Sequence, residues 1–146
     1  MSVAEPAELF FLDTNVLIYV FDRTAPEKQR VAEQLVRHAV TTGQGLISTQ
    51  VVQEFLHAAQ RKFERPMTLD ERRQHLEMVL APLCQYSPSI SFYDHALLIA
   101  EETGYAFYDA LIITAAVESG CRVLYSEDLQ HDRVVRGVRL VDPFRD

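Results

Sequence analysis

The stretch LFFLDTN, residues 9–15, decides the fold of this chain. Its four apolar residues make a run as long as a buried β-strand, and the run ends at Asp13. A helix can begin at about Asn15 and continue to Phe21. We therefore predict a strand at Leu9–Leu12 that delivers Asp13 to its carboxyl end.

Working outward, the rest of the chain alternates short apolar strands with helical patterns. Further strands are expected at residues 46–48, 84–86, 122–125 and 138–141, and further helices at 26–42, 51–63, 68–81, 92–103 and 107–119. This alternation indicates an α/β fold with a mostly parallel sheet of about five short strands. In such sheets the functional site lies outside the carboxyl ends of the strands.

Composition points to an ordinary globular protein. The 146 residues suit a single domain, and 48% of them are apolar and 24% charged. The first eight residues show no signal peptide, and the apolar runs are too short to span a membrane. Cys84 and Cys121 are isolated, which favours a reducing cytoplasm over a disulfide scaffold or a zinc site.

The charge is acidic but unevenly distributed. A net charge of −7, from 21 acids and 14 bases, argues against extensive phosphate binding. A basic strip nevertheless falls within residues 61–73, comprising Arg61, Lys62, Arg65, Arg72 and Arg73. This strip is either a solvated helix face or a local contact surface.

Four carboxylates from distant segments are expected at one edge of the sheet. Asp13 directly follows the first strand, and Asp128 follows the strand that ends at Tyr125. Glu54 lies on the helix that follows the second strand. Asp109 lies in the first turn of the helix that precedes the fourth strand. Three of them also have a structural alternative: Asp13 could cap a helix, Asp128 could be a first-turn acid favoured by a helix dipole, and Glu54 could pair with Arg61 on a solvated face.

The tripeptide Phe-Tyr-Asp occurs twice, at 92–94 and 107–109. Ser91 precedes Asp94 at the spacing of a capping box, so a structural role suffices for Asp94. The second copy has Ala106 in that place, and alanine cannot cap. The helix after Asp109 is apolar almost all round, so an acid at its buried entrance needs a partner such as a metal ion.

Clustered carboxylates suit a hard cation. They repel one another and raise each other's pKa unless a cation neutralises them. Mg²⁺ and Mn²⁺ prefer oxygen ligands and can activate a water against a phosphodiester. The five histidines have no zinc-binding spacing, which also favours phosphoryl chemistry.

These residues resemble the PIN domain, and more narrowly the VapC toxins of bacterial toxin–antitoxin pairs. The resemblance is carried by Phe-Leu-Asp13-Thr14-Asn15, by Glu54, by Phe-Tyr-Asp109-Ala-Leu and by Leu-Tyr-Ser126-Glu-Asp128. It covers residues 9–142. It implies a three-layer α/β/α fold and a single PIN domain over residues 1–146, with residues 1–8 as an N-terminal extension.

The resemblance also implies a metal-dependent endoribonuclease that uses Mg²⁺ or Mn²⁺. By position, the catalytic acids would be Asp13, Glu54, Asp109 and Asp128; the metal ligands Asp13, Asp109 and Asp128; and the supporting residues Thr14, Asn15 and Ser126. Glu127 could supply the fourth carboxylate in place of Asp128, although the serine-x-aspartate spacing favours Asp128. The implied partners are RNA, a cognate antitoxin that occupies the active-site groove, and a second copy of the chain in a homodimer.

Two alternative functions share some of these features. A phosphatase of the haloacid dehalogenase type also opens with an aspartate after an apolar strand, but it needs a second aspartate two residues on. Asn15 stands there and cannot serve as the acid. The other rival is a PIN fold that has lost catalysis and only binds RNA or protein; loss of one or more acids would mark it, and all four are present.

Overall fold

The computed structural model describes residues 8–145 and contains one sheet. The six strands, in the spatial order β3-β2-β1-β4-β6-β5, are β1 (Phe10–Leu12), β2 (Gly45–Ser48), β3 (Cys84–Tyr86), β4 (Val123–Tyr125), β5 (Val134–Val135) and β6 (Val138–Val141). Every neighbouring pair is parallel except β5 with β6. The mostly parallel α/β sheet is thus confirmed, with one strand more than expected.

The additional strand belongs to a tight hairpin. Arg136 and Gly137, between β5 and β6, both have positive φ, at 47° and 85°. Two left-handed residues in succession are typical of the two-residue turn that joins antiparallel strands. Only two residues of β5 pair with β6. A strand that short carries no periodicity by which a sequence could reveal it.

The helices fall close to their expected positions. They are α1 (Thr14–Tyr19), α2 (Pro26–Thr42), α3 (Thr49–Arg61), α4 (Leu69–His75), a π-helical turn η1 (Leu76–Leu80), α5 (Ala81–Leu83), α6 (Ile90–Thr103) and α7 (Phe107–Glu118). The helix expected over 68–81 is therefore one helical arm with a π-helical turn at its centre.

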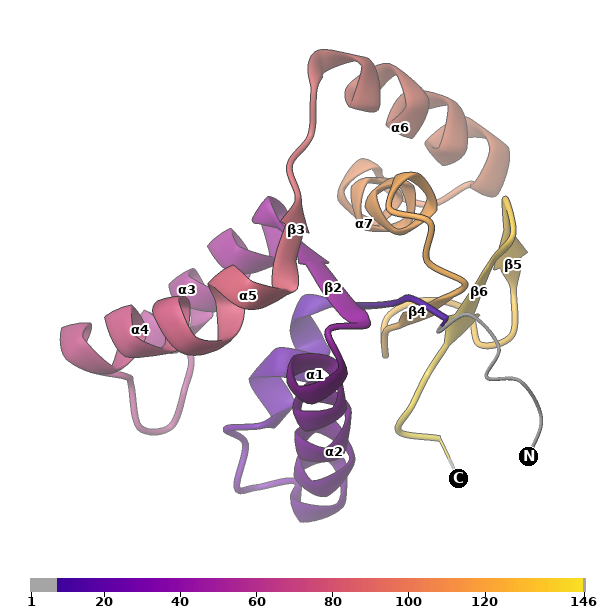
Figure 1. Ribbon diagram of the computed structural model, residues 1–146. Coiled ribbons are helices and arrows are strands. Elements are labelled where there is room, and N and C mark those ends of the chain that lie inside the picture. Colours follow the sequence, from indigo (N-terminus) through magenta and orange to yellow (C-terminus); the bar gives the residue numbers. More distant parts are fainter. Residues whose placement is uncertain (1–7, 146) are drawn as a thin grey trace, which may run out of the picture.

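The helices and the sheet form three layers. Figure 1 shows α6 and α7 on one side of the sheet and α1 and α2 on the other, with α3, α4 and α5 toward the β3 edge. Helix α7 packs against β4, β6 and α6, and its residues 110–116 are all buried. The expected α/β/α arrangement is confirmed, and α7 is buried on most sides as its composition predicted.

The spacings Thr68-x-x-Glu71 and Ser91-x-x-Asp94 each predict a capping box, and only the first of these boxes forms. The Thr68 hydroxyl accepts from the Glu71 amide at 3.2 Å, and the Glu71 carboxylate accepts from the Thr68 amide at 2.9 Å. The box expected at Ser91 and Asp94 is wrong. Helix α6 begins at Ile90, so Ser91 lies inside the first turn, and its hydroxyl pairs with that of Ser89 at 2.9 Å.

The strand order creates a crevice. The chain builds β2 and β3 on one side of β1, then crosses to build β4 and β6 on the other. At such a switch point the connections leave the sheet in opposite directions, and a crevice opens between the carboxyl ends of the two strands. Here those ends carry Asp13 and the segment 126–128. None of the helices described between residues 8 and 145 combines the length and apolar character needed to cross a bilayer.

Candidate active site

A hollow of about 470 Å³ lies at this crevice, and all four predicted acids line it. Asp13 comes from the end of β1, Glu54 from α3, Asp109 from the first turn of α7 and Asp128 from the segment after β4. Thr14 and Asn15 also line it. Residues that are far apart in the chain therefore converge on one cavity.

Asp13 lines the hollow and is buried. It caps α1, since its Oδ1 accepts from the Thr14 amide at 2.7 Å, and its Oδ2 accepts from the Ser126 hydroxyl at 2.7 Å. The pKa of Asp13 is raised to about 6, chiefly by burial; the hydrogen bonds from Ser126 and Thr14 oppose the shift, and the charges of Glu54 and Asp128 add to it. Asp13 therefore fills both of its predicted roles: it caps α1 and it belongs to the acid cluster.

Asn15 and Ser126 connect the two strand ends. The Asn15 side-chain amide donates to Asp128 Oδ2 at 3.1 Å and to Ser126 Oγ at 3.2 Å. The Asp128 amide also donates to Ser126 Oγ, at 3.1 Å. Ser126, almost fully buried, therefore holds Asp13 and the Asp128 backbone together.

Glu54 is held from two sides. The Thr14 hydroxyl donates to Glu54 Oε1 at 2.5 Å, and the Gln50 side-chain amide donates to Oε2 at 3.3 Å. The alternative ion pair with Arg61 does not form within the described residues. Glu54 therefore belongs to the hollow and not to a separate solvated face.

Asp109 is half-buried at the entrance of α7. Burial raises its pKa, and the charges of Asp128 and Glu54 add to the shift. Ala106 provides no side-chain cap, and among residues 8–145 no donor hydrogen-bonds the Asp109 carboxylate. Asp94, the look-alike in the other Phe-Tyr-Asp, is exposed on α6 and does not line the hollow.

Glu127 points to a different surface from Asp128. Its carboxylate accepts from the Tyr19 hydroxyl at 2.7 Å and pairs with Lys28 Nζ at 2.6 Å. It does not line the hollow, whereas Asp128 does. Of the two acids left open by the sequence, the geometry brings Asp128 to the cluster.

The donor set fits a hard cation. In the described part of the chain, none of the four carboxylates pairs with a lysine, arginine or histidine. The available ligands are oxygens, as Mg²⁺ and Mn²⁺ prefer. Within residues 8–145, no three acid, histidine or cysteine side chains stand close enough together to enclose an ion. An ion bound here would keep part of its shell as water, which is the usual habit of Mg²⁺.

Sequence reasoning gave no site role to several residues that line the hollow, among them Gln50, His57, Lys62 and Tyr108. A signal for two of them was present. Gln50 and His57 lie four residues before and three residues after Glu54, so they share its helix face. Gln50 also donates to the Tyr108 carbonyl at 3.4 Å, which ties α3 to the start of α7.

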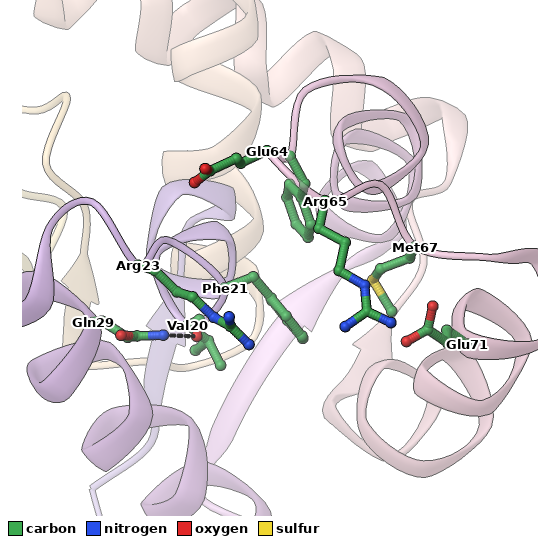
Figure 2. A pocket seen from close by; sticks show the side chains of 9 residues that line it. Val20, Phe21, Arg23, Gln29, Glu64, Arg65, Met67 and Glu71 are labelled. Carbon is green, nitrogen blue, oxygen red and sulfur yellow. Dashed lines mark hydrogen bonds between the residues drawn. The ribbon is translucent and has the colours of Figure 1, made fainter.

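A second hollow, of about 520 Å³, is lined by residues from segments 20–29 and 63–71 (Figure 2). Figure 2 shows Phe21 and Arg23, before α2, opposite Arg65 and Met67, after α3. Two acids, Glu64 and Glu71, also line it and balance its two arginines. The basic strip at residues 61–73 is therefore divided: Lys62 lines the acid cluster, Arg65 this second hollow and Arg73 a third surface.

Comparisons with known proteins agree with this architecture. A family model of the PIN domain matches residues 10–137. No curated protein matches the chain.

Three solved structures share the fold. A toxin–antitoxin complex from Klebsiella pneumoniae is 21% identical, with 91% of this chain and 96% of that chain covered and a TM-score of 0.64. DNA-bound VapBC from Salmonella typhimurium is 19% identical, with 94% and 99% covered and a TM-score of 0.64. FitAcB from Neisseria gonorrhoeae is 16% identical, with 93% and 99% covered and a TM-score of 0.61.

Proposed function

The chain belongs to the PIN-domain family, and on that premise we propose that it is a metal-dependent endoribonuclease and the toxin of a toxin–antitoxin pair. The observation that carries the proposal is the convergence of Asp13, Glu54, Asp109 and Asp128 on one hollow without a basic partner among the described residues. Such a cluster is electrostatically costly unless a cation occupies it. Its reaction would be hydrolysis of RNA phosphodiester bonds.

Asp13, Asp109 and Asp128 would hold the ion, Mg²⁺ or Mn²⁺, in part through its water ligands, because no three acids among residues 8–145 stand close enough together to enclose it. When bound, the ion supplies a water of lowered pKa and neutralises charge on the phosphodiester. Both oxygens of Asp13 already accept a hydrogen bond, which fixes the orientation of the carboxylate and leaves further lone pairs. Ser126 and Asn15 would keep Asp13 and Asp128 at a constant separation.

Glu54 would act as the general base for the attacking water. Its Oε1 is engaged by Thr14 and its Oε2 by Gln50 through a longer contact, so the carboxylate is oriented and not buried. We assign it to orient the attacking water and to accept its proton at Oε2. A general base must lie within hydrogen-bond reach of that proton, and Glu54 lines the hollow in which the water would bind.

The implied partners remain part of the proposal. The structural relatives from Klebsiella pneumoniae and Salmonella typhimurium are toxin–antitoxin assemblies, which supports a cognate antitoxin for this chain. Exposed apolar side chains on α6, with Ile90 at 86% and Leu97 at 58% exposure, support a homodimer. We place the protein in the cytoplasm, where its RNA substrate is found.

The test compares two aspartates that share a tripeptide. Purified wild type, Asp109→Asn and Asp94→Asn are assayed for RNA cleavage with EDTA, Mg²⁺ or Mn²⁺. Wild type should cleave only with a divalent cation. Asp109→Asn should lower kcat by at least about 100-fold, because losing even an outer-shell partner of a metal costs 10–100-fold. Asp94→Asn should retain full activity, since its side chain is exposed on α6 and outside the hollow.

Two results would contradict the proposal in different ways. Equal loss of activity in both variants, with both folded by circular dichroism, would remove the site assignment. Wild-type protein that binds RNA but does not cleave it with either cation would instead be a binding module on a PIN fold.

A further inference from the structure

We propose that Lys28 and Tyr19 are positioning residues of the candidate active site, acting through Glu127 on the segment 126–128. The inference rests on the proposed function and deepens it. Neither residue lines the acid hollow, and neither touches the four carboxylates. We call Tyr19, Lys28 and Glu127 the Glu127 clamp.

The clamp is a closed set of three contacts. Lys28 Nζ donates to Glu127 Oε2 at 2.6 Å, the Tyr19 hydroxyl donates to Glu127 Oε1 at 2.7 Å, and Lys28 Nζ lies 3.3 Å from the Tyr19 hydroxyl. Both carboxylate oxygens are therefore engaged. The Lys28 ammonium also lies 4.9 Å from the centroid of the Tyr19 ring and 5.9 Å from that of Phe144.

These contacts shift the pKa values of Glu127 and Lys28 in opposite directions. Burial alone would raise the pKa of Glu127, but the hydrogen bonds from Lys28 and Tyr19 outweigh it and hold the pKa below its ordinary value. The Lys28 pKa is raised in turn by its hydrogen bond to Glu127.

The clamp reaches the site through the backbone. Glu127 stands between Ser126, which donates to Asp13, and Asp128, which accepts from Asn15. Its own amide donates to Asn15 Oδ1 at 3.2 Å. A side chain held on one face of this segment thus fixes the two residues that face the other way. Helix α2, which carries Lys28, otherwise contributes nothing to the hollow.

A competing explanation is purely electrostatic, and it predicts the opposite sign. Removing the Lys28 charge beside an acidic cluster makes the local potential more negative, which by itself strengthens cation binding. Removing an anchor of the Asp128 segment loosens a proposed ligand, which weakens cation binding. Lys28→Met separates the two effects because they change the affinity in opposite directions.

The experiment measures Mn²⁺ affinity by titration calorimetry and RNA cleavage kinetics for wild type, Lys28→Met, Tyr19→Phe and Arg30→Met. Lys28→Met should bind Mn²⁺ about 10-fold more weakly and lose about 10-fold in kcat, as outer-shell partners do. The KM for RNA should stay within about 2-fold, because the clamp does not face the hollow. Tyr19→Phe changes no charge and should shift both quantities in the same direction by less.

Arg30→Met is the matched control. It removes an ion pair with Glu27 at 2.8 Å, on the same helix, that has no link to segment 126–128. Its Mn²⁺ affinity and kcat should equal those of wild type. Lys28→Arg should recover most of the lost affinity, since it restores a donor and a charge opposite Glu127.

Unchanged or stronger Mn²⁺ binding by Lys28→Met overturns the positioning role. Amide hydrogen exchange at Glu127 and Asp128 provides a readout independent of activity, because both amides donate to side chains of the site. Should wild type neither bind Mn²⁺ nor cleave RNA, the proposed function fails. Amide hydrogen exchange at Glu127 and Asp128 then tests the clamp independently of the proposed function. Faster exchange in Lys28→Met or Tyr19→Phe supports the clamp, and unchanged exchange in both variants overturns it.

Discussion

At the scale of single residues, Asp13 shows why one acid can serve structure and chemistry together. It caps α1 and yet lies buried beside Glu54 and Asp128, with its pKa raised to about 6. Its buried charge costs free energy, and a bound cation would offset this cost. Without a cation the same charge should weaken the fold.

The first prediction follows from that pKa. A raised folded pKa means that folding favours the protonated acid, so stability gained from Asp13 rises as pH falls from above 6 toward its unfolded value of 3.8. In EDTA, Asp13→Asn should therefore be more stable than wild type at pH 7.5 by up to about 3 kcal/mol. Near pH 4 the advantage should vanish.

Urea unfolding at pH 4, 6 and 7.5 measures this difference. The matched control is Asp94→Asn, whose side chain is exposed and should leave the pH dependence of the free energy of unfolding unchanged. An Asp13→Asn variant less stable than wild type at every pH would show that the capping bond to Thr14 outweighs the buried charge.

Asp94 and Asp109 carry a different lesson at this scale. The spacing of Ser91 and Asp94 predicts a structural role for Asp94 in a capping box, and that box does not form. Asp94 still lies outside the hollow, because it faces solvent on the outer helix α6. Of the two acids only Asp109 lines the hollow, and the burial of α7 explains this difference, whereas capping does not.

At the scale of elements, the sequence predicted only some of the helix caps and turns. Thr68 and Glu71 form the expected box, since Thr68 has extended backbone at the N-cap. Ser91 has the same spacing to Asp94, but the N-cap of α6 is Ser89. Local spacing predicted the N-cap of α6 at Ser91, and the structure places it at Ser89.

The second prediction concerns these two boxes. Thr68→Ala should lower the free energy of unfolding by about 1 kcal/mol, because it removes a formed cap. Ser91→Ala should change it by much less, because the Ser91 hydroxyl pairs only with the Ser89 hydroxyl. Thermal or urea unfolding of both variants measures the difference, and equal losses would contradict the assignment of the N-cap of α6.

At the scale of the whole molecule, the decisive feature is the reversal of strand order at β1 and β4. It brings the carboxyl ends of β1 and β4 together, and with them Asp13, Ser126 and Asp128. Packing of α3 and α7 then adds Glu54 and Asp109 to the same hollow. No local segment contains the site.

The third prediction tests the assembled cluster. At 100 times its dissociation constant, Mn²⁺ should stabilise the protein by roughly 2.7 kcal/mol. For a chain of this size that corresponds to a rise in Tm of about 5–10 °C at pH 7.5. At pH 5 the rise should be smaller, since the ion must then displace a proton from Asp13.

Differential scanning calorimetry with matched ionic strength in KCl measures the shift. Asp109→Asn should lose most of it, and Arg30→Met should keep it, because only Asp109 lines the hollow. A rise in Tm of the same size in Asp109→Asn would place the cation elsewhere on the protein.

The sequence by itself determined the α/β class, nearly every helix and strand, and the four acids, because strand ends and helical periods are set by neighbouring residues. It left open whether Glu127 or Asp128 faces the cluster and whether Glu54 serves a solvated face, and it wrongly placed the N-cap of α6 at Ser91. Only the tertiary structure decided these points. Each depends on which partner lies across the fold, Lys28 for Glu127 and Thr14 for Glu54, and contacts between distant segments exist only once the sheet brings them together.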